Sequence, residues 1–246
     1  MAADTSAPGT WDTPQQILVI LAHPDDPEFF CGATLARWAR AGHTVTYYLL
    51  TCGDKGYNDR TKVEDVLPDD LCALRHEEQA AAAKVIGAQA VHWLDRPDGY
   101  LVPDLELRRD VVRIIRRMKP DILMTCDPQN LFAGYGLNHP DHRAAGQVVL
   151  DAVFPAAGNA AYFPELLKEG YAPHMPKEVW CSLTRQPSVT LDITDMWPVK
   201  MQAILSHKSQ IGDPDKFMER MRTRRTEAST VEDPRYEESF RVASYR

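Results

Sequence analysis

Short apolar runs alternating with stretches of helical periodicity are the feature that most restricts the fold of this 246-residue chain. Four runs have the length and the β-branched content of buried parallel strands: 16–22, 44–51, 90–94 and 121–126. The segments between them repeat apolar residues at helical spacing: 29–41, 69–86 and 105–118. A strand–helix–strand order gives right-handed crossovers, with helices on both faces of the sheet. We therefore predict an α/β fold with a mainly parallel, Rossmann-like sheet.

Later in the chain, the same criteria predict a helix, two strands and a further helix, at 143–153, 178–183, 188–193 and 195–207. These segments contain no internal repeat and no sign of a second domain. Residues 1–14 are rich in Ala, Thr, Ser, Pro and Gly, which is the composition of a disordered leader. We therefore predict one domain over residues 15–246.

Composition restricts the partners of the chain. The formal net charge is −7, and no basic stripe with interleaved aromatic residues is present, which argues against a nucleic-acid partner. The basic run at 220–225 is interpreted as a solvated helix face. No apolar stretch approaches the roughly 20 residues of a membrane span, and the N-terminus lacks the pattern of a secretory signal. We predict a cytoplasmic protein whose partner is a small molecule.

The five cysteines are scattered, odd in number and free of any C-x-x-C pair. This pattern argues against a disulfide framework and against a zinc site made of thiolates. It is typical of a protein in a reducing cytosol.

Two His-Pro-Asp motifs lie beside predicted strands. H-P-D-D at 23–26 directly follows the first apolar run, and H-P-D-H at 139–142 directly precedes helix 143–153. The carboxyl edge of a parallel sheet is where such proteins bind ligands, and two motifs distant in sequence meet there if their strands are neighbours. Together they offer enough imidazoles and carboxylates for one divalent metal and a general base beside it.

Local geometry assigns roles within the motifs. Residues three apart share a face in a first helical turn, so His23 and Asp26 point the same way. Asp25 then points elsewhere and is free to act as a general base. Pro140 suits the first helical position and leaves His142 on the opening turn. We predict that His23, Asp26 and His142 are the metal ligands.

The second motif supplies two further candidate catalytic residues. We predict that His139 acts as a cation or acid near the developing oxyanion, and that Asp141 holds the His139 ring in one tautomer. Two histidines and one carboxylate leave positions open for water and substrate, as in catalytic zinc sites. The predicted metal is therefore zinc. Iron(II) sites also use this ligand set, and Fe²⁺ is the alternative.

Beyond these motifs, the chain resembles the PIG-L/LmbE family of metal-dependent N-deacetylases from residue 17 to about residue 210. The similarity rests on A-H-P-D-D-x-E, G-A-T-L, L-T-C-G-D-K-G, R-H-E-E and H-P-D-H, at 22–28, 32–35, 50–56, 75–78 and 139–142. The chain departs from the family pattern at Pro27. It departs again at Leu137, where some members have a tyrosine; here the nearest one is Tyr135.

The resemblance implies zinc-dependent removal of acetyl groups from N-acetylglucosamine-type substrates, or cleavage of related amides. By position it implies the same three ligands, with Asp25 as general base and His139 as transition-state stabiliser or acid. It also implies that Arg75 contacts the substrate, and the alternative is a surface ion pair on a helix.

Weaker candidates for substrate binding are Glu28 and Asp98. Glu28 is either a partner of the ligands or an ordinary acid at a helix N-terminus, and Asp98 either borders the pocket or makes a turn. His207 is interpreted as a helix cap. We expect the loops at 52–68, 127–138 and 156–177 to shape the pocket.

We therefore predict a zinc-dependent N-deacetylase acting on an N-acetylated sugar. Two alternatives stand beside it: an amidase acting on a thiol–sugar conjugate, and a sugar-binding α/β protein without catalysis. A homo-oligomer is possible. The sequence does not say whether Asp25 or His139 protonates the leaving amine.

Overall fold

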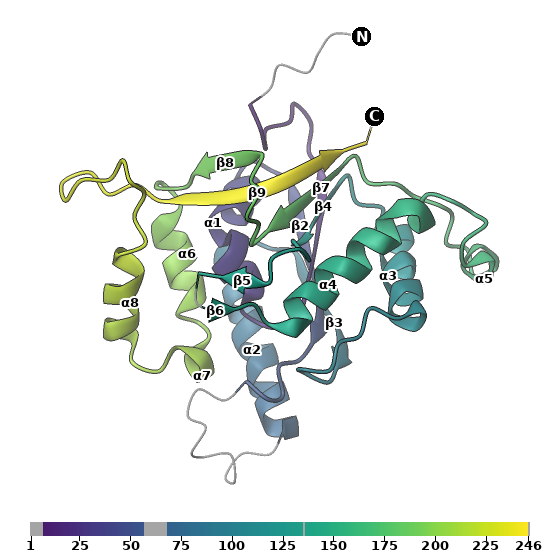
Figure 1. Ribbon diagram of the computed structural model, residues 1–246, viewed down its shortest axis with the longest axis horizontal. Helices are drawn as coiled ribbons and strands as arrows, with labels where there is room; N and C mark the ends of the chain where they lie inside the picture. Colours follow the sequence, from purple (N-terminus) through teal and green to yellow (C-terminus); the bar gives the residue numbers. More distant parts are fainter. Residues whose placement is uncertain (1–6, 57–67, 135, 246) are drawn as a thin grey trace.

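A computed structural model of the chain describes residues 7–56, 68–134 and 136–245. Its centre is a seven-stranded sheet with the order β3-β2-β1-β4-β7-β9-β8 (Figure 1). The strands are β1 (Gln16–Leu21), β2 (Thr44–Thr51), β3 (Ala90–Arg96), β4 (Ile122–Cys126), β7 (Glu178–Ser182), β8 (Val189–Asp192) and β9 (Glu237–Ser244). The first five strands in that order run parallel, and β9 is antiparallel to both its neighbours. The predicted α/β class is confirmed.

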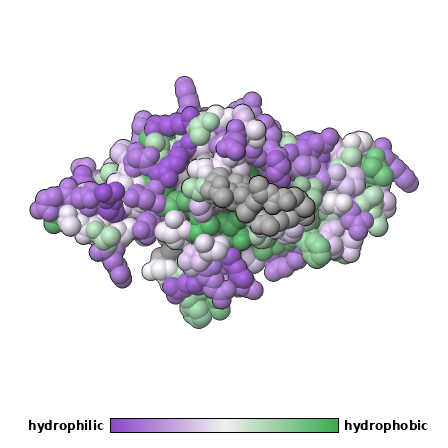
Figure 2. Space-filling view, turned by 90° about the horizontal axis from the view of Figure 1, so that it is seen from above, coloured by the Kyte–Doolittle hydropathy of each residue, from purple (hydrophilic) through white to green (hydrophobic). Residues whose placement is uncertain are grey.

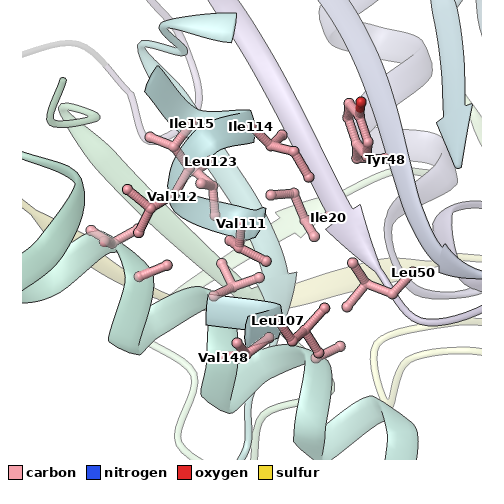
Figure 3. Close-up of a cluster of buried hydrophobic side chains, with 14 of the residues drawn as sticks. Ile20, Tyr48, Leu50, Leu107, Val111, Val112, Ile114, Ile115, Leu123 and Val148 are labelled. Atoms are coloured by element: carbon pink, nitrogen blue, oxygen red, sulfur yellow. The ribbon is translucent and has the colours of Figure 1, made fainter. Parts of the chain in front are cut away.

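Two apolar layers form because successive side chains of a strand point to opposite faces. Leu18 and Ile20 of β1 join the layer under α3 (Leu105–Met118) and α4 (Pro140–Asp151). Figure 3 shows part of this layer, including Ile20, Leu107 and Val148. Ile17 and Val19 join the other layer. On that face α1, α2 and α6 pack against one another, and their bounds are Asp26–Arg40, Pro68–Ile86 and Trp197–Ile204. Every long helix thus covers a face of the sheet and leaves the strand ends open.

Local signals explain why several elements match their predicted bounds. The Asp104 carboxylate accepts a hydrogen bond from the backbone N–H of Leu107 at 2.8 Å and caps α3. Lys119 ends α3 in the left-handed conformation. Helix α4 begins at Pro140 rather than at 143, because His139 is its N-cap and proline needs no N–H partner there. The segment η2 (Ala152–Ala157) follows it and is interrupted by a kink at Phe154, whose backbone angles are not helical.

The C-terminal third differs most from the sequence-based prediction. The predicted helix at 195–207 ends as α6 at Ile204 and is followed by α7 (Lys208–Ile211) and α8 (Pro214–Arg222). Strand β9 and the short helix α5 (Pro164–Lys168) were not predicted. The two buried positions of β9 alternate, but one of them is the acid Glu238, so the segment lacks a clear alternation of polar and apolar residues.

The predicted disordered leader is wrong for residues 7–14, which lie against the domain. The Trp11 ring packs against Trp38 at 5.1 Å between centroids, and the indole N–H of Trp38 donates to the Gly9 carbonyl at 2.8 Å. Packing of the half-buried Trp11 ring stabilises this segment against the disorder that its composition favours. Figure 2 views this end of the molecule and shows hydrophobic residues near the centre of a mostly hydrophilic face. Residues 1–6 lie outside the described chain.

The prediction of unpaired cysteines is also wrong for one pair. Cys52, after β2, and Cys72, on α2, form a disulfide with 5.1 Å between their Cα atoms, although they are 20 residues apart. The packing of α2 beside β2 brings them together, which no spacing rule reveals. The other three cysteines are free and buried. No helix within the described ranges has both the length and the apolar character needed to cross a membrane.

Candidate active site

The two His-Pro-Asp motifs meet at the carboxyl edge of the sheet. Strand β1 ends at Leu21, two residues before His23, and it pairs with β4, from which the chain runs through a hairpin to α4. That hairpin consists of β5 (Phe132–Ala133) and β6 (Gly136–Leu137). Because β1 and β4 are neighbours, both motifs open onto one cavity.

The donor groups of three side chains from these motifs lie together in a triangle. The Nε2 atom of His142 lies 3.2 Å from Nδ1 of His23 and 3.0 Å from Oδ1 of Asp26. Nδ1 of His23 lies 3.5 Å from Oδ2, the other carboxylate oxygen of Asp26. Tetrahedral bonds of about 2.0–2.1 Å separate neighbouring ligand atoms by roughly 3.3 Å. The three residues predicted as ligands therefore fit one face of a tetrahedral cation site, and all three are buried.

The electrostatics of this triangle favour a bound cation. Burial opposes the charge of Asp26, but His142 and His23 outweigh it and hold the pKa of that carboxyl well below its usual value. Burial likewise opposes a charge on His23, yet Asp26 and the neighbouring carboxylates raise the pKa of that ring well above its ordinary value. Positive charge at this point is thus stabilised by the surrounding side chains.

The outward nitrogen of His23 faces two carboxylates. Its Nε2 lies 3.1 Å from Oδ1 of Asp98 and 3.3 Å from Oδ2 of Asp141. Asp141 also accepts hydrogen bonds from the backbone N–H groups of Gly99 and Leu101, at 2.7 and 3.1 Å. Carboxylates in this position orient a ligating ring and increase its basicity.

This arrangement corrects two predictions. The Asp141 carboxylate holds His23 rather than His139, because the start of α4 turns it toward β1 and the 99–101 turn. Asp98 lines the cavity, but its carboxylate also contacts His23. Burial opposes charge on both carboxyls, and the hydrogen bond from His23 nevertheless holds the pKa of Asp98 and of Asp141 below the usual value.

His139 points its ring at the cavity from the N-cap of α4. Its Nδ1 accepts a hydrogen bond from the backbone N–H of Asp141 at 3.2 Å, which leaves the proton of the neutral ring on Nε2. Burial and the neighbouring imidazoles of His23 and His142 lower the pKa of His139. The ring can therefore act as a neutral hydrogen-bond donor.

Asn138 is a functional candidate that the sequence-based prediction missed. Its Oδ1 lies 2.9 Å from Nδ1 of His142, and its amide donates to the carbonyl of Asn130 at 2.8 Å. The first contact places the proton of His142 on Nδ1 and turns Nε2 toward the triangle. Its place directly before H-P-D-H was the available signal.

Asp25 has a strained backbone that frees its carboxylate. It stands at the N-cap of α1 with φ of 88°, a left-handed conformation that costs on the order of 1–3 kcal/mol for a residue with a Cβ. The side chain makes no cap hydrogen bond and lines the cavity instead. Gln79 holds the strained turn by accepting the N–H of Asp25 at 2.8 Å.

Arg75 is buried and binds Asp25 directly. Its Nη2 donates to Oδ2 of Asp25 at 3.0 Å and to the carbonyl of Pro24 at 2.6 Å. The interpretation of Arg75 as a surface ion pair is therefore wrong. Burial raises the pKa of Asp25, against the opposing charges of Arg75 and His207. A carboxylate with a raised pKa beside a cation site is suited to accept a proton.

Two glycines make room for Arg75. A Cβ added at Gly53 would lie 2.1 Å from the Nη1 atom of Arg75, and one at Gly56 would lie 2.3 Å from it. The same Nη1 donates to the Gly53 carbonyl at 3.1 Å. The L-T-C-G-D-K-G segment thus serves as the cradle of the guanidinium group.

Glu28 is fully buried and does not line the cavity, so its predicted role in substrate binding is wrong. It faces Nε2 of His207 at 3.1 Å and accepts two hydrogen bonds from Gln79, at 3.0 and 3.1 Å. Gln79 also accepts a hydrogen bond from the backbone N–H of Asp25, so this network fixes the position of Asp25. His207 makes no cap hydrogen bond with its side chain. Gln79 lies four residues after Arg75, on the same helix face, which was a usable signal.

The cavity at this edge has a volume of about 840 Å³. Of the loops expected to shape it, the described parts of 52–68 and 127–138 contribute Gly56, Gly134 and Leu137, whereas 156–177 contributes none. Phe29 and Phe30 of α1 add to the wall, and the later part of the chain contributes Leu183, Gln210, Arg220 and Arg224. Tyr135 lies outside the described residues.

Comparison with known proteins gives consistent matches. The family model described as PIG-L, GlcNAc-PI de-N-acetylase, matches residues 18–153. A diacetylchitobiose deacetylase from Thermococcus kodakarensis is 34% identical, over 80% of this chain and 70% of that protein. A 1D-myo-inositol 2-acetamido-2-deoxy-alpha-D-glucopyranoside deacetylase from Saccharopolyspora erythraea is 29% identical, with 89% of each chain covered.

A solved structure agrees with these matches. The N,N'-diacetylchitobiose deacetylase from Pyrococcus horikoshii, in complex with an inhibitor, superposes with a TM-score of 0.82 at 28% identity. The alignment covers 94% of this chain and 84% of that one. Similarity therefore extends well beyond the segment that the family model matches.

Proposed function

Since this chain belongs to the PIG-L family of GlcNAc-PI de-N-acetylases, we propose that it hydrolyses the N-acetyl amide of an N-acetylglucosamine-type or related small glycoside. The observation that carries the proposal is the convergence of His23, Asp26 and His142 on one point, with the carboxylate of Asp25 beside it. Acetate and a free amine are the products.

Zinc is the proposed metal. Two neutral imidazoles and one carboxylate with open positions are the ligand set of catalytic zinc sites, and Fe²⁺ is the alternative that the same set accommodates. A bound zinc ion supplies Lewis acidity toward the acetyl carbonyl and the attacking water. His23, Asp26 and His142 hold this ion, and Asp98, Asp141 and Asn138 orient the rings.

Asp25 is the proposed general base. It takes a proton from water as the water attacks the amide carbon, and Arg75 keeps its carboxylate turned into the cavity. Arg75 also lines the cavity and contacts the substrate. The strained backbone and the Gln79 hydrogen bond fix the position of the base before substrate arrives.

His139 is the proposed stabiliser of the oxyanion. Its neutral ring carries the proton on Nε2, and one such donor contributes roughly 2.7–4 kcal/mol to transition-state binding. A neutral ring that donates this hydrogen bond has no spare proton to release. Asp25, protonated by the attack, therefore returns a proton to the leaving amine.

The substrate proposal follows the relatives. Both curated relatives described above are named for 2-acetamido sugars, and a cavity of about 840 Å³ has room for a small glycoside. A thiol–sugar conjugate would use the same inner residues and differ only at the outer wall. A sugar-binding protein without catalysis would have no need of the strained Asp25 or its two supports.

The test is release of primary amine from N,N'-diacetylchitobiose and from simple 2-acetamido glycosides. We expect turnover that a chelator abolishes and that added Zn²⁺ restores. His142→Ala should lose both the bound metal and the activity. His92→Ala, which removes an imidazole from β3 outside the cavity, is the matched control. Metal-independent turnover, or full activity of His142→Ala, would contradict the proposed mechanism.

A further inference from the structure

A second group of metal-binding side chains lies at the same sheet edge, outside the catalytic cavity. Cys52 follows β2, Cys72 and His76 lie one turn apart on α2, and Asp95 lies in β3. None of the four lines the cavity described above. The proposed deacetylase mechanism gives them no role.

The donor atoms of this group converge. Nε2 of His76 lies 3.0 Å from Oδ1 of Asp95 and 3.8 Å from Sγ of Cys72. The disulfide places the sulfur of Cys52 next to that of Cys72. One ligand atom from each of the four residues lies within 4.8 Å of every other.

These spacings suit a tetrahedral ion. Zinc bonds of about 2.3 Å to sulfur and about 2.0–2.2 Å to nitrogen and oxygen place neighbouring ligand atoms roughly 3.3–3.8 Å apart. The contacts of His76 with Cys72 and with Asp95 lie near this range. Rotation about the Cα–Cβ bonds of reduced Cys52 and Cys72 would move their sulfurs apart to the distance between neighbouring ligands.

The surroundings hold the imidazole in place. The His76 ring stacks on Trp93 of β3, with 3.8 Å between centroids. Cys52 is buried, whereas the side chains of His76 and Asp95 are 29% and 55% exposed. The group therefore has a fixed inner half and an outer half that solvent and ions can reach.

We propose that Cys52, Cys72, His76 and Asp95 form a second, redox-controlled site for a soft divalent cation of the Zn²⁺ type. Two electrons and two protons from a dithiol reductant convert the disulfide into two thiols, and the reductant leaves as its own disulfide. Binding of the cation then displaces the two thiol protons. The disulfide form lacks two ligands and does not bind the ion.

This site would act next to the catalytic base. Cys52 directly precedes Gly53, and Cys72 lies three residues before Arg75, so the cluster joins the glycine cradle to the helix that carries the guanidinium. Either the disulfide or the bound ion would connect the glycine segment at Cys52 to α2. In the reduced, ion-free form this connection would be absent.

The experiment is a titration of the reduced, metal-free full chain with Co²⁺. A thiolate bound to Co²⁺ gives charge-transfer absorption in the near ultraviolet, which the two histidines and one aspartate of the catalytic site cannot give. We expect this absorption together with one bound ion beyond the catalytic one. Protein oxidised to the disulfide, verified by thiol counting after denaturation, should show neither.

Variants make the test specific. The double variant Cys52→Ser/Cys72→Ser should abolish the absorption, and His76→Gln, which leaves the disulfide able to form, should weaken Co²⁺ binding at this site at least tenfold. Cys181→Ser, which removes one of the free buried thiols, should change nothing. The proposal is overturned if reduced protein binds only the catalytic ion, if the absorption persists in Cys52→Ser/Cys72→Ser, or if His76→Gln binds as the parent does.

Discussion

The inner end of the catalytic cavity and its outer rim are built in opposite ways. At the inner end, His23, Asp26 and His142 are buried, and their polar atoms contact one another or a supporting side chain. At the rim, Leu137 is 70% exposed, and Arg220 and Arg224 are exposed on or just after α8. A buried, fully bonded group holds one geometry, whereas an exposed side chain can adapt to what it meets.

The segment that the family model matches contains the inner end of the cavity but only part of its rim. Residues 18–153 contain all the proposed catalytic residues. Of the rim residues, Leu183, Gln210, Arg220 and Arg224 lie beyond that segment, whereas Leu137 lies within it. We infer that the inner end determines the reaction and that the rim determines which glycoside is accepted.

The largest effect is expected at the base. Asp25→Asn keeps the size of the side chain but removes the proton acceptor, so kcat should fall by about 10²–10⁴-fold. Zinc content should stay unchanged, since Asp25 is not a proposed ligand. Steady-state kinetics and elemental analysis check both statements, with exposed Asp12→Asn as the matched control. Retention of parental kcat would show that another group takes the proton.

The second-largest effect is expected at His139, the proposed hydrogen-bond donor to the oxyanion. His139→Ala removes the Nε2 proton and should lower kcat by about 10²–10³-fold with little change in metal content. If His139 were instead a metal ligand, the same variant would lose zinc. Elemental analysis of the purified variant distinguishes these outcomes.

A smaller effect is expected from the support of a ligand. Asn138→Ala removes the hydrogen bond to Nδ1 of His142 and should weaken metal affinity by about 10–100-fold. Activity measured at saturating Zn²⁺ should recover most of the parental value. Failure of added zinc to restore activity would mean that Asn138 acts on something other than the metal.

The glycine cradle offers a matched pair. Gly53→Ala should displace Arg75 and lower kcat, because the new Cβ would lie 2.1 Å from Nη1. Gly42→Ala has the same left-handed strain (φ of 92°, against 70° at Gly53) but meets no atom within 4 Å. Both variants should lose on the order of 1 kcal/mol of stability, measured by urea unfolding, and only Gly53→Ala should lose activity. Equal kinetics would remove the role assigned to Arg75.

The smallest effect is expected at the rim. Arg220→Gln or Arg224→Gln should leave kcat unchanged and alter KM by less than about tenfold, because an exposed charge contributes roughly 1 kcal/mol or less. Arg222→Gln, on the same helix but off the cavity wall, is the control. A loss of kcat as large as that of Asp25→Asn would contradict the division between inner end and rim.

Much of this protein could be predicted because its signals are local. The strand at Thr44–Thr51 and the helix at Leu105–Met118 match the predicted bounds, since run length and apolar spacing reflect how each segment is buried. Strand β9 was not predicted, because one of its two buried residues is the acid Glu238, whose burial depends on contacts with Lys200 and with the backbone of α1. The Cys52–Cys72 pair depends in the same way on how α2 packs beside β2.

The amino-acid sequence by itself determined which side chains are available and how each motif turns, because a proline and a three-residue spacing act through the backbone alone. Only the tertiary structure decided that Asp141 faces His23, that Asn138 turns His142 and that Glu28 lies beneath Gln79. His23 and Asp141 are 118 residues apart, so their contact depends on the pairing of β1 with β4. Such a contact follows from the packing of the whole domain, and no local pattern encodes it.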